Sequence, residues 1–231
     1  MEDTGCFQEV NVAVFGGAFN PPTFGHSEIV KVIRKEMARN ESLIIDEVLV
    51  VPCAAHPFGK SLALFRDRVN MCKLAFGDES KVEEEIQVKI KSDKTYDLMV
   101  YLSSLSIMCH FFPVIGTDEA KEIHHWYEWE KLLYDYKMIV VDRPVNSRLI
   151  RPVEIKYRES SHYYLRPDPA IPITSSSQVR TNFKILWPII DSWTAKGWGL
   201  DSMYNDEFSG LICREVFDYI VENRLYAPEE K

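Results

Sequence analysis

The sequence predicts an α/β protein with a doubly wound parallel sheet and a helical portion at its C-terminus. Three observations favour this fold class. Apolar runs of strand length alternate along the chain with segments in helical spacing, which is typical of parallel βαβ units. The first apolar run ends at a glycine pair, Gly16-Gly17, and the last periodic segment, 211–223, is strongly amphipathic. In such sheets, ligands bind beyond the carboxyl ends of the strands.

The individual elements follow from the spacing of the apolar residues. Short apolar runs predict strands over 10–15, 46–52, 111–115 and 137–141. The alternation of Ile86, Val88 and Ile90 predicts a further strand over 85–90. Helical spacing predicts helices over 27–39, 65–76, 96–106, 119–134 and 211–223, and the start of a helix over 177–187. The stretch 153–165 is rich in β-forming residues but ambiguous, and 187–209 cannot be assigned from its pattern.

The length of 231 residues fits one large domain or two small ones. We expect a single domain over residues 1–231, in which 145–170 is a mobile connection. The net charge of −8 argues against a nucleic-acid-binding surface. No run approaches the roughly 20 apolar residues of a membrane span. The N-terminus lacks a secretory pattern and the five cysteines are scattered, so we expect a cytoplasmic protein with reduced thiols.

The segment 14–26, VFGGAFNPPTFGH, combines a glycine turn with a histidine. Gly16 and Gly17 carry no Cβ, so main-chain N–H groups there can approach a phosphate closely. Thr23 and His26 are three residues apart and share one face of the next helical turn, where the helix N-terminus favours negative charge. This pattern suits a polyphosphate, although a plain strand–turn–helix junction fits the glycine pair alone equally well.

A second candidate phosphate site is the segment 173–180, ITSSSQVR. Ser175, Ser176 and Ser177 offer hydroxyl groups and an N-cap, and the backbone amides at a helix start point outward. Arg180 follows about one helical turn later, and its planar guanidinium matches phosphate oxygens. Alone, the segment fits a simple N-cap with a solvated arginine. Together with the first motif, it favours a phosphate clamp.

The two motifs resemble those of the nicotinate and nicotinamide mononucleotide adenylyltransferases, which belong to the nucleotidyltransferase superfamily marked by [HT]-x-G-H. The first is similar to G-G-[ST]-F-[ND]-P-x-H-x-G-H and the second to I-S-S-T-x-[IV]-R. The sequence departs from the pattern at Thr23, where many members have histidine, and at Ala18, where serine or threonine is common. The resemblance covers 10–144 and 171–228, implies a Rossmann-like nucleotidyltransferase fold, and makes 181–210 a divergent, insertion-like segment.

The resemblance implies transfer of AMP from ATP to a pyridine mononucleotide in NAD biosynthesis, with release of pyrophosphate. It implies that Mg²⁺ arrives with ATP and needs no dedicated set of protein ligands. The catalytic residues would be His26, Thr23, Lys60 and Arg180. The residues that contact ATP would be Gly16, Gly17, Gly116, Asp118, Arg143, Ser175, Ser176 and Ser177. Those that contact the mononucleotide would be Ala18, Phe19, Asn20, Thr95, Trp126 and Tyr127.

Several alternatives stay open at this stage. A sister nucleotidyltransferase that acts on phosphopantetheine or forms a CDP-alcohol shares both motifs, and a non-catalytic protein could use them to sense a dinucleotide. A dinucleotide-binding oxidoreductase is disfavoured because no G-x-G-x-x-G follows the first strand. Trp126 also fits a core anchor, and Lys60 a solvated lysine. The sequence does not decide between nicotinate and nicotinamide, nor does it fix the physiological direction or whether the chain forms a homo-oligomer.

Overall fold

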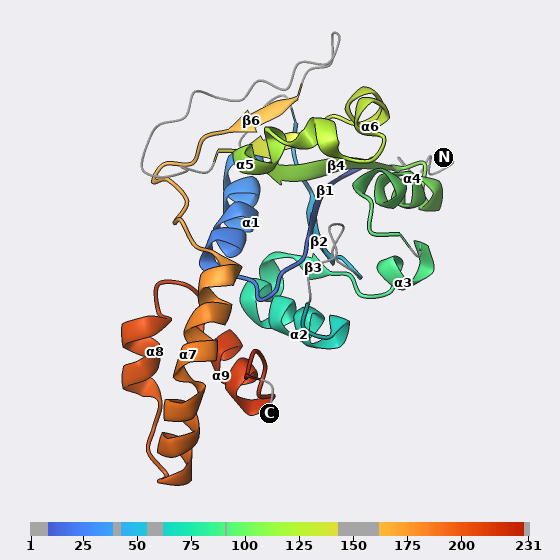
Figure 1. Cartoon of the computed structure of the whole chain (residues 1–231). Coiled ribbons are helices and arrows are strands. Elements are labelled where there is room, and N and C mark those ends of the chain that lie inside the picture. Colours follow the sequence, from blue (N-terminus) through green and yellow to red (C-terminus); the bar gives the residue numbers. More distant parts are fainter. Residues whose placement is uncertain (1–8, 39–42, 55–61, 91, 143–161, 229–231) are drawn as a thin grey trace, which may run out of the picture.

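The computed structural model describes residues 9–38, 43–54, 62–90, 92–142 and 162–228. Within them, six strands form one parallel sheet in the order β3-β2-β1-β4-β5-β6 (Figure 1). This order confirms the predicted doubly wound class, because the chain winds outward from β1 to β3 and in the other direction from β4 to β6. The strands are β1 (Val10–Gly17), β2 (Glu47–Pro52), β3 (Lys81–Val82), β4 (Cys109–Gly116), β5 (Ile139–Val141) and β6 (Tyr163–Leu165).

The two central strands, β1 and β4, mark the point where the winding reverses. β1 pairs with β2, where Val14 lies beside Leu49, and with β4, where Val14 lies beside Pro113. Because the strands are parallel, β1 and β4 end at the same edge of the sheet. Their connections then leave in opposite directions, and such a switch point opens a crevice between them.

Alternate residues of each strand enter two separate cores, as expected for a sheet buried on both faces. From β1, Ala13 and Phe15 join one core, and Val12 and Val14 join the other. The first core also contains residues of α1 (Phe24–Met37) and α2 (Phe65–Phe76). The second core is covered by α3 (Ile86–Ile90), α4 (Thr95–Leu105), α5 (Thr117–Ala120), η2 (Ile123–His125) and α6 (Trp129–Asp135).

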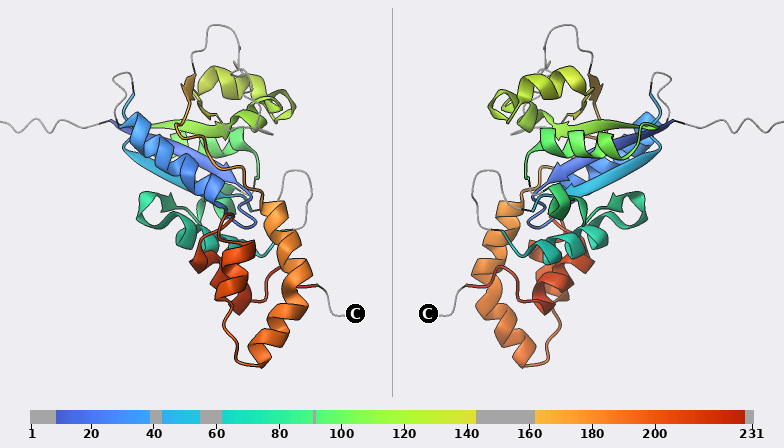
Figure 2. Two further views of the ribbon diagram at one scale, coloured as in Figure 1. Left: turned by 90° about the vertical axis from the view of Figure 1, so that its left-hand side faces the viewer. Right: turned by 90° about the vertical axis from the view of Figure 1, so that its right-hand side faces the viewer.

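The predicted C-terminal helical portion consists of α7 (Ser176–Ala195), α8 (Asp201–Glu207) and α9 (Arg214–Glu222). These helices form a group that extends from one end of the sheet (Figure 2). A third apolar core joins them, in which the rings of Phe183, Phe208 and Phe217 contact one another. Met71 of α2 belongs to the same core, so this group is anchored to the sheet domain.

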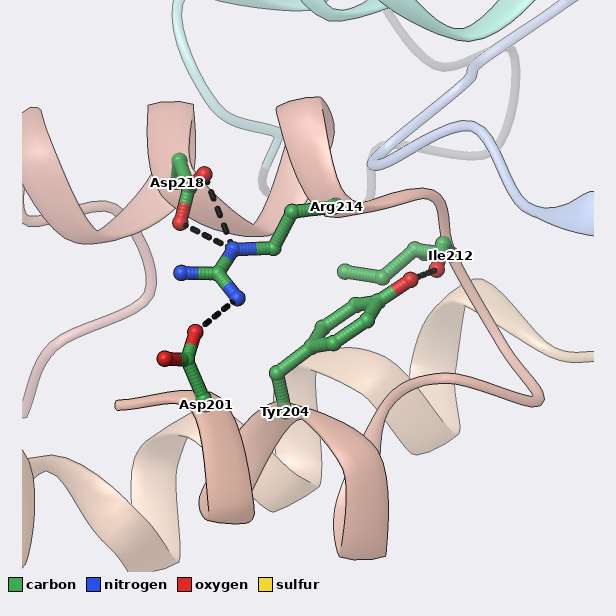
Figure 3. A network of polar contacts seen from close by, with 5 residues as sticks. All are labelled: Asp201, Tyr204, Ile212, Arg214 and Asp218. Carbon is green, nitrogen blue, oxygen red and sulfur yellow. Dashed lines mark hydrogen bonds and ion pairs between the residues drawn. The ribbon is translucent and has the colours of Figure 1, made fainter. Parts of the chain in front are cut away.

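A polar network ties α8 to α9 (Figure 3). The guanidinium Nε of Arg214 donates to both carboxylate oxygens of Asp218, at 2.8 and 2.9 Å, and Nη1 donates to Asp201. The hydroxyl of Tyr204 donates to the carbonyl oxygen of Ile212 over 3.1 Å. These bonds connect both helices and the turn between them, so the network fixes their relative position.

Two predicted elements are wrong. Residues 86–90 form α3 instead of a strand. Ile86 and Ile90 are four residues apart, a spacing that suits one face of a helix as well as one face of a strand. The single helix predicted over 119–134 is broken into α5, η2 and α6. The break before α6 lies at Glu128, whose φ of 52° is in the left-handed region and cannot continue a right-handed helix.

The stretch 187–209, unassigned from its pattern, comprises the second half of α7 and the whole of α8. Pro188 lies inside α7 although it has no N–H to donate, and buried Trp187 and Ile190 hold the helix on the third core on both sides of it. Of 145–170, β6 pairs with β5, and residues 145–161 lie outside the described part of the chain. No helix among the described residues has the length and apolar character to cross a membrane.

Candidate functional site

A cavity of about 1100 Å³ opens where β1 and β4 end. Its wall combines the turn after β1, the first turn of α1, the segment after β4 and the start of α7. This is the switch point at which doubly wound sheets bind ligands. Most of the predicted site residues line it: Gly16, Gly17, Ala18, Phe19, Asn20, His26, Thr95, Asp118, Trp126, Tyr127, Ser176, Ser177 and Arg180.

Three of the predicted site residues that the structure describes do not line the cavity. Among the described residues, Thr23 and Gly116 are buried behind the cavity wall. Ser175 is the N-cap of α7, where its side chain accepts from the main-chain N–H of Ser177, and it does not line the cavity. Lys60 and Arg143 lie outside the residues that the structure describes.

The conformation of the turn after β1 depends on glycine, which has no Cβ, at two positions. A Cβ on Gly17 would lie 3.0 Å from the ring of Phe19, whereas a Cβ on Gly16 would meet only the carbonyl oxygen of Val51, at 4.0 Å. Phe19 adopts a φ of 44° and packs its ring edge-on against Phe15 in the core. Gly17 therefore lets the turn close over an aromatic ring, and Gly16 leaves the main chain open to the cavity.

His26 lies in the first turn of α1, and its ring is held by the residue that begins the helix. The main-chain N–H of Thr23 donates to Nδ1 of His26 over 3.0 Å, and the Thr23 hydroxyl lies 2.8 Å from the same nitrogen. Thr23 is the N-cap, so the imidazole makes the contact that glutamate or glutamine makes in a common capping box. The ring of Phe19 packs edge-on against the imidazole, with centroids 5.2 Å apart.

Arg180 joins the two sequence motifs directly. Its Nη1 donates to the carbonyl oxygen of Asn20 over 2.7 Å, and its Nη2 donates to the hydroxyl of Ser177 over 3.0 Å. The hydroxyl of Ser176 donates to the carbonyl oxygen of Pro21 over 2.7 Å. The turn after β1 and the N-terminus of α7 therefore form one surface, on which the guanidinium lies beside the glycine turn.

The residues predicted to contact the mononucleotide include two adjacent aromatic side chains. Trp126 lines the cavity and also packs against the second core, so its position is compatible with contact to a ligand and with a role in the core. Tyr127 lines the cavity with 52% of its surface exposed. Thr95 begins α4 on the same wall. Carboxylates add negative charge to this wall, at Asp93, Asp118, Glu119 and Glu122.

Two residues that support the phosphate motifs were not predicted from the sequence. The hydroxyl of Thr174 accepts from the main-chain N–H of Gly25 and donates to the hydroxyl of Thr23, both over 2.9 Å. The hydroxyl of Tyr226 donates to the amide oxygen of Asn20 over 2.9 Å. These partners are 149 to 206 residues apart in the sequence, so no local pattern could reveal them.

Arg68 was not among the predicted site residues, although an arginine on the apolar face of a helix is a signal. Its side chain is 1% exposed and donates to three carbonyl oxygens, those of Ala18 at 2.8 Å, Ala63 at 3.1 Å and Ala54 at 3.2 Å. The ion pairs between described residues do not include Arg68. One buried guanidinium thus fastens the turn after β1 to the segment between β2 and α2.

Burial sets the protonation of two groups at the site. It raises the pKa of the Cys53 thiol on the cavity wall, against the opposing effect of Arg68, so this thiol is held in its weakly nucleophilic form. Burial also raises the pKa of Tyr226 well above its ordinary value, against Arg180 and Arg68, so its hydroxyl keeps the proton that it donates. Among the described residues, His, Cys, Asp and Glu form no cluster of three that could hold a metal ion.

Comparison with known proteins identifies the family of this chain. The cytidylyltransferase-like family matches residues 14–182. A protein of Leptospira interrogans named "Probable nicotinate-nucleotide adenylyltransferase" is 28% identical over 93% of this chain and 96% of its own length. A protein of the same name from Caldicellulosiruptor saccharolyticus is 32% identical over 74% of this chain and 85% of its own length.

Among solved structures, the nicotinic acid mononucleotide adenylyltransferase of Plasmodium falciparum complexed with NaAD is similar, with a TM-score of 0.63 and 25% identity. The match covers 94% of this chain and 97% of that one. The fold, the two motifs on one cavity and these matches lead to the same assignment. The chain belongs to the cytidylyltransferase-like family, in its nicotinate-nucleotide adenylyltransferase branch.

Proposed function

We propose that this protein transfers AMP from ATP to nicotinate mononucleotide, forming nicotinate adenine dinucleotide and pyrophosphate in NAD biosynthesis. The observation that carries the proposal is the single cavity shared by His26, Arg180 and Trp126. It offers cationic and N–H donors for a polyphosphate and an aromatic ring for a pyridine. The names of the relatives support nicotinate over nicotinamide as the acceptor.

In the proposed reaction, a phosphate oxygen of the mononucleotide attacks the α-phosphorus of ATP in line with the leaving group. A new P–O bond forms, the bond from the α-phosphorus to the bridging β-oxygen breaks, and its electron pair leaves with pyrophosphate. The attacking phosphate is already anionic, so the protein needs no covalent nucleophile. Catalysis then depends on positioning and on donors placed where negative charge develops.

In this proposal, residues at different parts of the cavity bind different phosphates of ATP. The main chain at Gly16 and the ring of His26 would bind the α-phosphate at the end of β1. Arg180 and the hydroxyls of Ser176 and Ser177 would hold the leaving phosphates at the start of α7, where the helix dipole also favours negative charge. Thr23 would act from behind, through the ring of His26.

Magnesium would enter as part of the substrate, bound to the phosphates of ATP. Mg²⁺ keeps several waters and takes one or two carboxylates from a protein in such sites. The cavity wall provides oxygen donors of this kind, for example Asp118.

The four described cysteines are free, which supports the cytoplasmic location expected from the sequence.

Steady-state kinetics of pyrophosphate release tests the proposal. ATP is offered with nicotinate mononucleotide, nicotinamide mononucleotide and phosphopantetheine, and CTP is offered with a phosphorylated alcohol. We expect the highest kcat/KM with nicotinate mononucleotide and the loss of turnover in His26→Ala. A preference for phosphopantetheine or CTP would assign the chain to a sister activity. Binding of the dinucleotide without turnover would assign it to a sensor.

A further inference from the structure

A chain of hydrogen bonds runs behind the cavity from the second motif to the first. The main-chain N–H of Gly25 donates to Oγ1 of Thr174, whose hydroxyl donates to Oγ1 of Thr23. The Thr23 hydroxyl then lies 2.8 Å from Nδ1 of His26. Thr174 is 6% exposed and Thr23 is 2% exposed, so water does not compete for these bonds.

The main-chain N–H of Gly25 can only donate, so Thr174 accepts the first bond of this chain. The hydroxyl of Thr174 then donates to Oγ1 of Thr23. The Thr23 hydroxyl therefore has its proton available for Nδ1 of His26. The main-chain N–H of Thr23 points to the same Nδ1 and again can only donate. The main-chain bond requires Nδ1 to be an acceptor, which places the ring proton on Nε2, and the Thr23 hydroxyl can donate to Nδ1 in that tautomer.

We propose that Thr174 is a positioning residue for adenylyl transfer: through Thr23, it holds His26 in the neutral tautomer that carries its proton on Nε2. His26 then acts on the phosphate as an oriented hydrogen-bond donor. This inference rests on the proposed function only in naming the phosphate as the group that receives the bond.

The tautomer is tested first, without substrate. Long-range proton–nitrogen NMR spectra of ¹⁵N-labelled protein at neutral pH distinguish a protonated ring nitrogen from an unprotonated one. The His26 signals are identified by their loss in His26→Gln. We expect a protonated Nε2 and an unprotonated Nδ1 in the wild type and in Thr174→Ser. In Thr174→Val, we expect the two nitrogen shifts to move toward each other, because the released Thr23 hydroxyl no longer has a fixed direction.

The kinetic consequence is tested in the same variants. We expect Thr174→Val to lower kcat about tenfold or more, while KM for ATP changes by less than about threefold, because the donor acts on charge that develops in the transition state. Thr174→Ser keeps the hydroxyl and is expected to restore kcat to within about twofold of the wild type. Thr194→Val is the matched control, since that hydroxyl bonds to Ile190 at the other end of α7.

Three results would overturn the inference. The first is a wild-type His26 with its proton on Nδ1 or on both nitrogens at neutral pH. The second is an unchanged kcat in Thr174→Val. The third is a Thr174→Val that loses activity while its His26 signals match the wild type, which would leave Thr174 only a packing role. If Thr174→Val does not fold, the wild-type spectrum still tests the tautomer, and Thr174→Ala tests the loss of the hydroxyl. Absence of dinucleotide formation by the wild type would contradict the proposed function but leave the tautomer result standing.

Discussion

The guanidinium of Arg180 donates to the carbonyl oxygen of Asn20 over 2.7 Å, although 160 residues separate the two in the sequence. A second bond to Ser177 fixes the plane of the same group. The arginine is therefore oriented before any ligand arrives. This arrangement lowers the cost of ordering a long side chain during binding.

We expect Arg180→Ala to lower kcat/KM about a hundredfold or more, because the phosphates lose an oriented cation. Arg180→Lys keeps the charge but cannot make both bonds at once, so we expect it to recover only a small part of the activity. Pyrophosphate release measures both effects. Lys184→Ala, at an exposed position one turn further along α7, is the control. Activity close to wild type in Arg180→Ala would remove this residue from the site.

Replacement of Arg68 tests the buried connection between the two loops. Arg68→Met leaves three carbonyl oxygens without a donor, and we expect unfolding to become easier by at least about 3 kcal/mol. Arg66→Met is a matched control, because Arg66 is exposed two residues earlier and such changes stay within about 0.5 kcal/mol. Urea denaturation compares the two variants. Equal stability of both would show that the three bonds of Arg68 contribute nothing net.

Replacement of Trp126 separates its role in the cavity from its role in the core. If the ring stacks on the pyridine, we expect Trp126→Ala to raise KM for the mononucleotide about 5- to 100-fold, in line with roughly 1–3 kcal/mol per stacked base. KM for ATP should stay within about twofold. Trp198→Ala, at an exposed tryptophan beyond α7, is the control. A loss of thermal stability with an unchanged KM would support the core-anchor interpretation instead.

The buried hydroxyl of Tyr226 predicts a pH dependence of stability. Burial raises its pKa in the folded protein, so above pH ~10 the unfolded chain loses this proton first. The unfolded state then binds fewer protons, and the free energy of unfolding falls with pH by at most about 1.4 kcal/mol per unit for this group. At neutral pH, the wild type should be about 1 kcal/mol more stable than Tyr226→Phe because of the bond to Asn20.

This advantage of the wild type over Tyr226→Phe should shrink as the pH rises from about 9 to 11. Denaturant unfolding at several pH values in that range measures it. Tyr134→Phe, at a tyrosine with 67% of its surface exposed, provides the reference for a change without burial. A constant difference between wild type and Tyr226→Phe across the range would contradict the raised pKa.

Local patterns in the sequence determined the alternation of strands and helices and both phosphate motifs. Long apolar runs such as the one in β1 bury on both faces of a sheet, and only a parallel sheet with helices on each side satisfies them. Short or interrupted segments were less informative. The spacing of the isoleucines in α3 fits both the helical and the strand period. The residues around Glu128 give no local signal of its left-handed backbone conformation.

Only the tertiary structure decided which side chains line the cavity and which lie buried behind it. The sequence placed Thr23 with His26, but the fold buries Thr23 and joins it to Thr174, 151 residues away. It likewise connects Tyr226 to Asn20 across 206 residues. The spacing of apolar residues along the sequence indicates which residues are buried, because the buried face of a helix or strand repeats with the period of that element. A hydrogen bond between distant elements depends on how those elements pack, and that information is not local.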